Sequence, residues 1–187
     1  MDIFKGRISS SGFSGGDRVV IGDWMTSPLG EFTNVMWAKS NGRRILLSPS
    51  EAHAEFVSEI YDFEEVRVVE IKVLRGRKKV SVKAGDLQVR MEWGFSLLLP
   101  FWRPLWFTRI IEGPIGRVVF GSKTYGRTKD GRKEWYSVRG IARLNGADAI
   151  FEGRNLGEMT NLQATACFGF SEPPARPSSV KLSAFIE

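Results

Sequence analysis

The sequence has little of the chemistry that many enzymes and metal sites use, because it contains one cysteine, Cys167, and one histidine, His53. A single cysteine excludes an internal disulfide, and one residue of each kind excludes a zinc site built on Cys and His ligands. The strand neighbours of Cys167 supply neither a base nor a cation, so a catalytic thiolate is not expected. His53 shares a helical stripe with apolar residues, which is typical of a partly buried structural histidine rather than a haem ligand or general base.

The sequence also lacks the short motifs that mark catalytic and nucleotide sites. The nearest approach to a nucleophile elbow, Gly12-Phe13-Ser14-Gly15, has the wrong spacing, and no Walker or dinucleotide-binding glycine motif is present. The acidic residues between 51 and 65 have no Lys or Arg among them, which is typical of a solvated face rather than of metal ligands. We therefore expect no metal and no cofactor, and we assign no catalytic residue.

Long uninterrupted apolar runs are missing too. The most apolar stretch, residues 95–111, includes Arg103, Arg109 and two prolines, and a membrane-spanning helix needs a longer run without such breaks. The first residues lack the apolar run of a signal peptide. We expect a cytoplasmic protein with no transmembrane segment.

The composition is that of an ordinary soluble domain. Of the 187 residues, 42% are hydrophobic and 26% are charged, and a chain of this length can bury a normal core. No repeat and no Pro/Ser-rich linker divides the chain. Residues 1–187 are therefore expected to form a single β-rich domain.

One segment carries a helix signal. Ser48-Pro49-Ser50-Glu51 is a capping box with proline at the first helical position. Phe56, Val57 and Ile60 then recur at helical spacing. The pattern predicts a helix over about residues 49–61 that packs through these three side chains.

Most of the remaining chain has the alternation or the β-branched content of strands. The expected strands are residues 18–24, 32–38, 43–47, 66–74, 79–84, 87–93, 115–120, 162–170 and 180–186. A meander of this length with one apolar face must close or fold over itself to bury that face. We predict a mainly β fold, an antiparallel up-and-down meander closed as a lipocalin-like barrel or as two packed sheets, with the helix at an open end or side.

Two dipeptides predict hairpins with a defined register, because Asn-Gly and Asp-Gly favour two-residue turns. A turn at Asn145-Gly146 places Arg139 opposite Glu152 and Arg143 opposite Asp148, pairing opposite charges on one face. A turn at Asp130-Gly131 places Tyr125 opposite Tyr136 and Arg127 opposite Glu134.

The aromatic content and the barrel architecture suggest a function in small-molecule binding. The expected ligand is small and apolar or amphipathic, held in an internal cavity. The candidate wall residues are Met91, Trp93, Tyr125, Tyr136 and Phe151. The alternative is a barrel-cavity enzyme of the isomerase, hydratase or cyclase type, in which Tyr136 or an Arg127–Glu134 pair supplies acid–base chemistry. A buried carboxyl or tyrosine beside a cavity favours the enzyme.

The net charge of +6 is concentrated in two basic runs, residues 72–83 and 117–143. A basic patch is the usual mark of nucleic-acid binding. However, the first run includes an expected exposed hairpin turn, lysine on strand edges also blocks aggregation, and no nucleic-acid motif is present. A basic nucleic-acid-binding module is therefore the less favoured alternative.

Aromatic residues gather between Trp93 and Phe107, and they cannot all face water. Pro100 and Pro104 prevent a long regular element in this segment. We expect Trp102 or Trp106 to lie at a subunit contact or at a pocket mouth, and a homodimer is the simplest cover for the segment.

Three segments, GFSGGDRVVIG, NVMWAKSNGRRILLSP and CFGFSEPPARPS, resemble segments of a family of small uncharacterised bacterial proteins with no established activity. The resemblance covers most of the chain. It implies no catalytic motif, no ligand and no cofactor.

Overall fold

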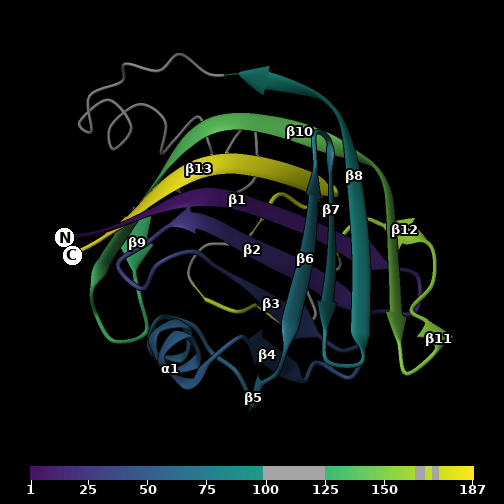
Figure 1. The fold of residues 1–187 in the computed structure, drawn as a ribbon, viewed down its shortest axis with the longest axis horizontal. Coiled ribbons are helices and arrows are strands. Elements are labelled where there is room, and N and C mark those ends of the chain that lie inside the picture. The colour runs from purple at the N-terminus through teal and green to yellow at the C-terminus, as the bar shows by residue number, and fades with distance from the viewer. Residues whose placement is uncertain (99–124, 163–166, 170–172) are drawn as a thin grey trace.

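The computed structural model describes residues 1–98, 125–162, 167–169 and 173–187, and these form one strongly curved sheet with one short helix. The sheet curls into a half-barrel, with β6, β7 and β8 standing across the open side of β1, β2 and β3 (Figure 1). The mainly β, mostly antiparallel fold with one helix is confirmed. The strands along the path are β1 (Asp2–Phe13), β2 (Arg18–Thr26), β3 (Phe32–Ala38), β4 (Arg44–Ser48), β5 (Glu65–Val68), β6 (Ile71–Gly76), β7 (Lys79–Ala84), β8 (Leu87–Leu98), β10 (Lys133–Phe151) and β13 (Ser178–Ile186).

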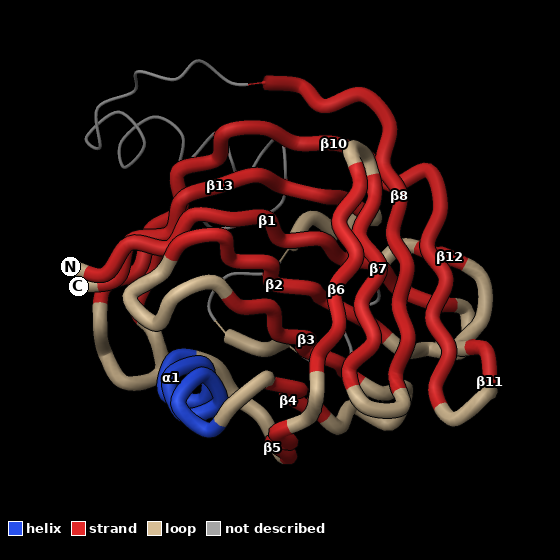
Figure 2. The backbone as a smooth tube through the Cα atoms, viewed as in Figure 1, coloured by secondary structure: helices blue, strands red, loops and turns tan. Residues whose placement is uncertain are grey.

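The strand order departs from a simple meander at one place. The order is β5-β4-β3-β2-β1-β13-β10-β8-β7-β6, so the last strand is inserted between the first strand and β10. The two chain ends therefore lie side by side (Figure 2). Three short strands lie off this path: β9 (Tyr125–Arg127) and β11 (Arg154–Asn155) pair with β10, and β12 (Met159–Thr160) pairs with β1. The path ends at β5 and β6, which leaves the curl open between them.

The helix α1 (Glu51–Ile60) forms where the capping signal predicted it. The predicted capping residue, Ser48, is wrong by two positions, because the hydroxyl of Ser50 caps the helix by accepting a hydrogen bond from the backbone N–H of His53. Val57 and Ile60 are buried as predicted, whereas Phe56 is only half-buried. The helix covers the outer face of the sheet beside β4 and β5 (Figure 1).

The alternation of side chains along the strands produces two cores on opposite faces. The inner core joins β2, β3 and β4 to β7, β8 and β10 across the concave side, and its fully buried members include Trp37 and Met91. The outer core joins α1 to the convex side of β1, β3, β4, β10 and β13. Because each strand contributes alternate residues to each face, the sequence fixes which side chains can meet inside the curl.

The predicted hairpin at Asn145-Gly146 is wrong. Both residues lie inside β10, which continues for 19 residues and turns at Glu152-Gly153, where φ is +49° and +77°. The Asn145 side chain lies against Gly94 of β8, at a point where the ladder shifts register. The Asn-Gly pair thus forms part of a β-bulge rather than a turn. Accordingly, Asp148 lies opposite Arg90 instead of Arg143.

The hairpin around Asp130-Gly131 forms, but its register differs by one residue from the prediction. Tyr125 lies opposite Trp135 rather than Tyr136, and Glu134 lies opposite Gly126 rather than Arg127. The N–H of Thr128 bonds to the carbonyl of Arg132, and Gly131 has a φ of +88°. These are the marks of a three-residue loop with glycine in the left-handed conformation.

One observed strand was not predicted, and three predicted strands differ from the structure or lie outside its described part. The strand β1 has no predicted counterpart, because its serines and Gly6 interrupt an apolar alternation. The predicted strand 66–74 divides into β5 and β6. In the predicted strand 162–170, the described residues 162 and 167–169 are not in a strand, and Cys167 is exposed. The predicted strand 115–120 lies outside the described residues.

Candidate anion-binding cleft

The concave side of the half-barrel contains a cleft of about 540 Å³, between the β1–β13 strands and the turn of the β6–β7 hairpin. Its volume falls in the range of small-molecule sites. One lining residue is acidic, Asp23, whereas seven are basic. The basic residues are Lys5, Arg7, Arg75, Arg77, Lys79, Arg139 and Lys181.

Strand alternation explains why bases point inward. In β1, Phe4 and Ile8 face the outer core, so Lys5 and Arg7 face the cleft. Between these two bases, Gly6 allows β2 to approach closely, since a Cβ there would lie 2.2 Å from the carbonyl oxygen of Asp23. β13 repeats the pattern, because Lys181 and Ser183 line the cleft while Val180 and Ala184 belong to the outer core.

Arg7 is held in place by contacts on two sides. Its Nη1 donates to the hydroxyl of Ser179 at 3.0 Å, and its guanidinium lies 4.6 Å from the ring centroid of Trp93. Burial lowers the pKa of Arg7, and the nearby carboxylate of Asp23 partly opposes that effect. A planar guanidinium held in this way, with reduced hydration, is well suited to a carboxylate or phosphate.

The acid of the cleft is already engaged. Asp23 is 8% exposed and accepts from the hydroxyl of Thr33 at 2.7 Å and from Nε and Nη2 of Arg75 at 2.9 and 2.8 Å. Arg75 also reaches Glu31 at 2.8 Å, and its hydrogen bonds with Asp23 raise its pKa. The two nitrogens of Arg75 thus form a fork on the carboxylate of Asp23, and this Arg75–Asp23 fork links β2 to the β6–β7 hairpin. It also leaves the cleft with a positive balance of charge, which attracts anions.

The inner surface beside Arg7 is polar on one side and apolar on the other. The hydroxyls of Ser9 and Ser179 are 2.7 Å apart, and Ser183 lines the cleft nearby. Trp93 and Val80 supply the apolar side. The arrangement can therefore hold an anionic group against the bases and an apolar group against the indole. Among the described residues, no cluster of three or more His, Cys, Asp or Glu side chains is placed to hold a metal.

The residues predicted to line a ligand cavity are divided among several places. Trp93 lines the cleft. Met91, on the same strand, lies in the inner core and does not line the cleft. Phe151 packs against Trp37, with ring centroids 4.8 Å apart, in a separate hollow. The backbone of Tyr125 pairs with β10. The Tyr125 side chain, Trp102 and Trp106 lie outside the described residues.

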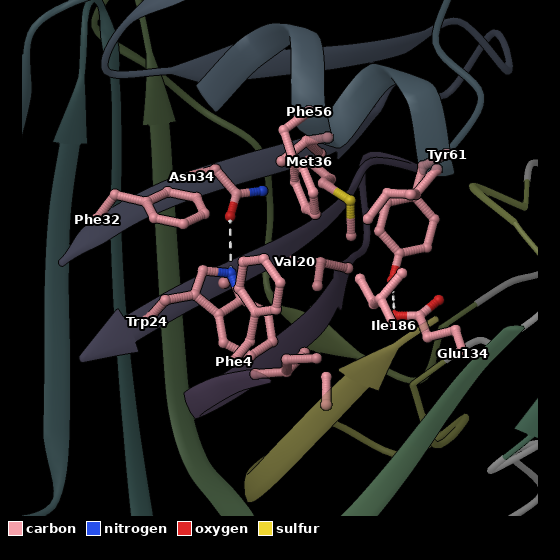
Figure 3. A pocket seen from close by; sticks show the side chains of 15 residues that line it. Phe4, Val20, Trp24, Phe32, Asn34, Met36, Phe56, Tyr61, Glu134 and Ile186 are labelled. Atoms are coloured by element: carbon pink, nitrogen blue, oxygen red, sulfur yellow. Dashed lines mark hydrogen bonds between the residues drawn. The ribbon is translucent and has the colours of Figure 1, made fainter. Parts of the chain in front are cut away.

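Tyr136 lies on the opposite face of the sheet, among the residues of the outer core. Its hydroxyl is 2.5 Å from that of Tyr61, and Tyr61 donates to Oε1 of Glu134 at 3.2 Å. Glu134 is 1% exposed, and its burial raises its pKa to about 7. The predicted Arg127–Glu134 pair does not form, because the pairing places Lys133 opposite Arg127. Tyr61 and Glu134 border a small cavity beneath α1 (Figure 3).

Sequence reasoning missed the bases of β1 and β13. The signal was present, since Lys5 and Arg7 alternate with Phe4 and Ile8, and Lys181 lies between Val180 and Leu182. In an exposed sheet such bases would face water. Here the sheet curls and β6–β7 crosses in front of them, so the solvated face of the pattern becomes the wall of a cleft.

Comparison with known proteins gives a distant similarity in fold. No protein-family model and no curated protein matches the chain. One of the solved structures that match is acetoacetate decarboxylase from Legionella pneumophila subsp. pneumophila str. Philadelphia 1, with a sequence identity of 15% and a TM-score of 0.47. The match covers 99% of this chain and 84% of that chain. In the described part of the chain, no helix is long and apolar enough to cross a membrane.

Proposed function

We propose that the protein binds a small organic anion in the concave cleft. The observation that carries the proposal is the set of seven bases on the inner wall, opposed by one acid that already pairs with Arg75. A carboxylate or phosphate would supply the missing negative charge and accept hydrogen bonds from Arg7 and its neighbours.

The ligand also has an apolar or aromatic part. Trp93 and Val80 border the cleft and offer an apolar surface beside Arg7. The size of the cleft suits a small molecule. This favours an amphipathic small ligand over a nucleic acid, whose phosphates would need bases spread along an outer surface.

Calorimetric titration with a matched set of probes tests the proposal. The probes are phenylacetate, phenyl phosphate and the uncharged phenylacetamide, at low and high salt. We expect the two anions to bind and the amide to bind at least about tenfold more weakly, since a charge-assisted hydrogen bond is worth roughly 1.5–3 kcal/mol. The anion affinities should also fall with added salt.

Two lysine variants localise the effect. Lys181→Gln removes a base of the cleft, whereas Lys83→Gln removes an exposed base of β7 that lies outside it. The first should weaken anion binding several-fold and the second should leave it unchanged. Equal binding of phenylacetamide, or equal effects of the two variants, would refute the proposal.

An enzyme of the isomerase, hydratase or cyclase type is the second candidate function. The observation that favours it is Glu134, which borders the small cavity beneath α1 rather than the concave cleft. A buried carboxyl with a pKa near 7 is suited to general acid–base catalysis at neutral pH. A direct test follows deuterium uptake from D2O into small ketones by NMR. An enzyme of the isomerase type should catalyse the exchange with a pH dependence centred near pH 7, and Glu134→Gln should abolish it. Exchange at the uncatalysed rate, or unchanged exchange in the variant, counts against this candidate.

A further inference from the structure

Three bases form a row across adjacent strands on the inner wall of the concave cleft. Arg7 of β1 lies directly opposite Lys181 of β13 in the antiparallel ladder, and both side chains line the cleft. On β10, the other neighbour of β13, Gly140 lies opposite Lys181, and Arg139 beside it also lines the cleft. The strands β1, β13 and β10 are consecutive in the sheet (Figure 2). The row therefore crosses three strands with one base on each.

A bulge in β10 gives Arg139 its place in this row. In the ladder with β13, Val138 and Gly140 pair with consecutive residues of the partner strand, so Arg139 between them is an extra residue. Val138 and Ile141 both pack against the outer core, although strict alternation would place residues three apart on opposite faces. The bulge thus keeps Arg139 on the cleft side and still returns Ile141 to the outer face.

The row places like charges opposite each other, which is unfavourable across paired strands. Directly opposite residues have Cβ atoms about 4.5–5.5 Å apart, so the charges of Arg7 and Lys181 lie on neighbouring stems. Arg7 donates to a neutral partner, the hydroxyl of Ser179. The acid of the cleft, Asp23, lies opposite Arg7 on β2, but its carboxylate is held by Arg75. Anionic groups placed between the three bases would convert the repulsion into attraction.

We infer that the concave cleft takes a small dicarboxylate, whose two carboxylates occupy the two intervals of the row. One carboxylate lies between Arg7 and Lys181, and the other lies between Lys181 and Arg139. Because adjacent strands are about 4.8 Å apart, the two carboxylates lie about 5 Å from each other. Two single negative charges among three bases leave the row nearly neutral, and a guanidinium matches a carboxylate in shape. The inference rests on the function proposed above and specifies the charge and the spacing of its ligand.

Calorimetric titration with benzoate and the three benzenedicarboxylates tests the inference at about pH 7.5, where the carboxyl groups are ionised. The carboxyl carbons of isophthalate are about 5 Å apart, which matches one strand spacing. Those of phthalate are closer, and the carboxylates of terephthalate point in opposite directions. Isophthalate should bind at least about tenfold more tightly than benzoate, since it gains a second charge-assisted contact. It should also bind more tightly than its two isomers, which carry the same charge.

Two arginine variants assign the second carboxylate. Arg139→Gln removes one end of the row, whereas Arg154→Gln removes an exposed base of β11 outside the cleft. Arg139→Gln should reduce the affinity for isophthalate to near that for benzoate. It should leave the affinity for benzoate unchanged, because a single carboxylate needs only the interval between Arg7 and Lys181. Arg154→Gln should change neither affinity.

The outcomes separate this inference from the function proposed above. Equal affinities for the three isomers would show that net charge alone governs binding, and would overturn the inference. Equal affinities for benzoate and isophthalate, or equal effects of the two arginine variants on isophthalate, would also overturn it. Binding of benzoate in those cases would still support an anion site in the cleft. If none of the four probes binds, both the inference and the proposed function are wrong.

Unfolding without ligand gives an independent readout of the row. Lys181→Gln removes a charge that lies opposite Arg7, so it should raise the midpoint of urea unfolding at low salt. The gain should shrink at high salt, because salt screens the repulsion. Arg154→Gln should leave the midpoint unchanged. An unchanged or lowered midpoint in Lys181→Gln would contradict the like-charge row on which the inference rests.

Discussion

The buried carboxyl of Glu134 should make the stability of the protein depend on pH in a direction opposite to that of most carboxyl groups. Its pKa is about 7 in the folded protein against an ordinary value of 4.5, because the surrounding apolar wall disfavours the charged form. A raised folded-state pKa means that the unfolded chain releases the proton first. The stabilising contribution is therefore fully present below about pH 4.5 and is lost as pH rises through about 7.

The size of the effect follows from the two pKa values. Their difference, at about 1.4 kcal/mol for each pKa unit, corresponds to roughly 3 kcal/mol of unfolding free energy. Little discount for solvent is needed, since the residue is 1% exposed. Glu134→Gln removes the titration and retains a similar shape. The variant should therefore gain about 3 kcal/mol relative to the unaltered protein between about pH 4 and about pH 8.

Urea unfolding of both proteins at a series of pH values measures this difference. Other titrating groups cancel in the comparison because they are common to both proteins. A difference in unfolding free energy that stays constant from acid to mildly alkaline pH would refute the reasoning. It would mean that Glu134 is hydrated or paired in solution.

The remaining predictions concern the helix and the fork at the cleft. Ser50→Ala removes the helix cap and should cost about 1 kcal/mol in urea unfolding. Ile60→Ala should cost about 3 kcal/mol because Ile60 is buried, and Phe56→Ala, at a half-buried position, should cost about 2 kcal/mol; the reverse order would show that the helix is rotated. Asp23→Asn weakens the link to Arg75 and should speed hydrogen exchange of the β6–β7 amides, with no change in the amides of β3. Unchanged exchange in the hairpin would show that the fork does not hold it.

Local sequence signals predicted those elements that local physics determines. The capping serines and the stripe of Val57 and Ile60 placed the helix within two residues. Alternation placed β3 and β7 at their observed bounds. These features depend on neighbouring residues and on which face is buried, both of which a sequence displays directly.

The errors arose where a distant strand decided the outcome. Asn145-Gly146 has the chemistry of a turn, but β8 pairs along the whole segment and Asn145 fills the space above Gly94. Tyr136 was assigned to the same cavity as Trp93, but a bulge between Val138 and Gly140 shifts β10 by one residue, so Tyr136 faces the outer core although Leu144, of the same parity, faces the inner core. A register difference of one residue moves a side chain to the other face.

The candidate cleft could not be predicted from the sequence for a related reason. Arg7 and Lys181 come from opposite ends of the chain and meet because β13 inserts beside β1. No local pattern specifies that insertion. The sequence did show the concentration of positive charge in residues 72–83. The role of this run in closing the cleft, however, depends on the contact of Arg75 with Asp23 across the curl.

The most direct test of the central claim is an NMR titration of the isotopically labelled protein with phenylacetate, following the Arg7 Nε–H and the Trp93 indole N–H signals. The claim that the concave cleft binds organic anions predicts saturable shifts of both signals, with matching shifts in the backbone amides of Ser179 and Ser183. Shifts confined to exposed bases such as Lys83, or no saturable shift at Arg7, would contradict it.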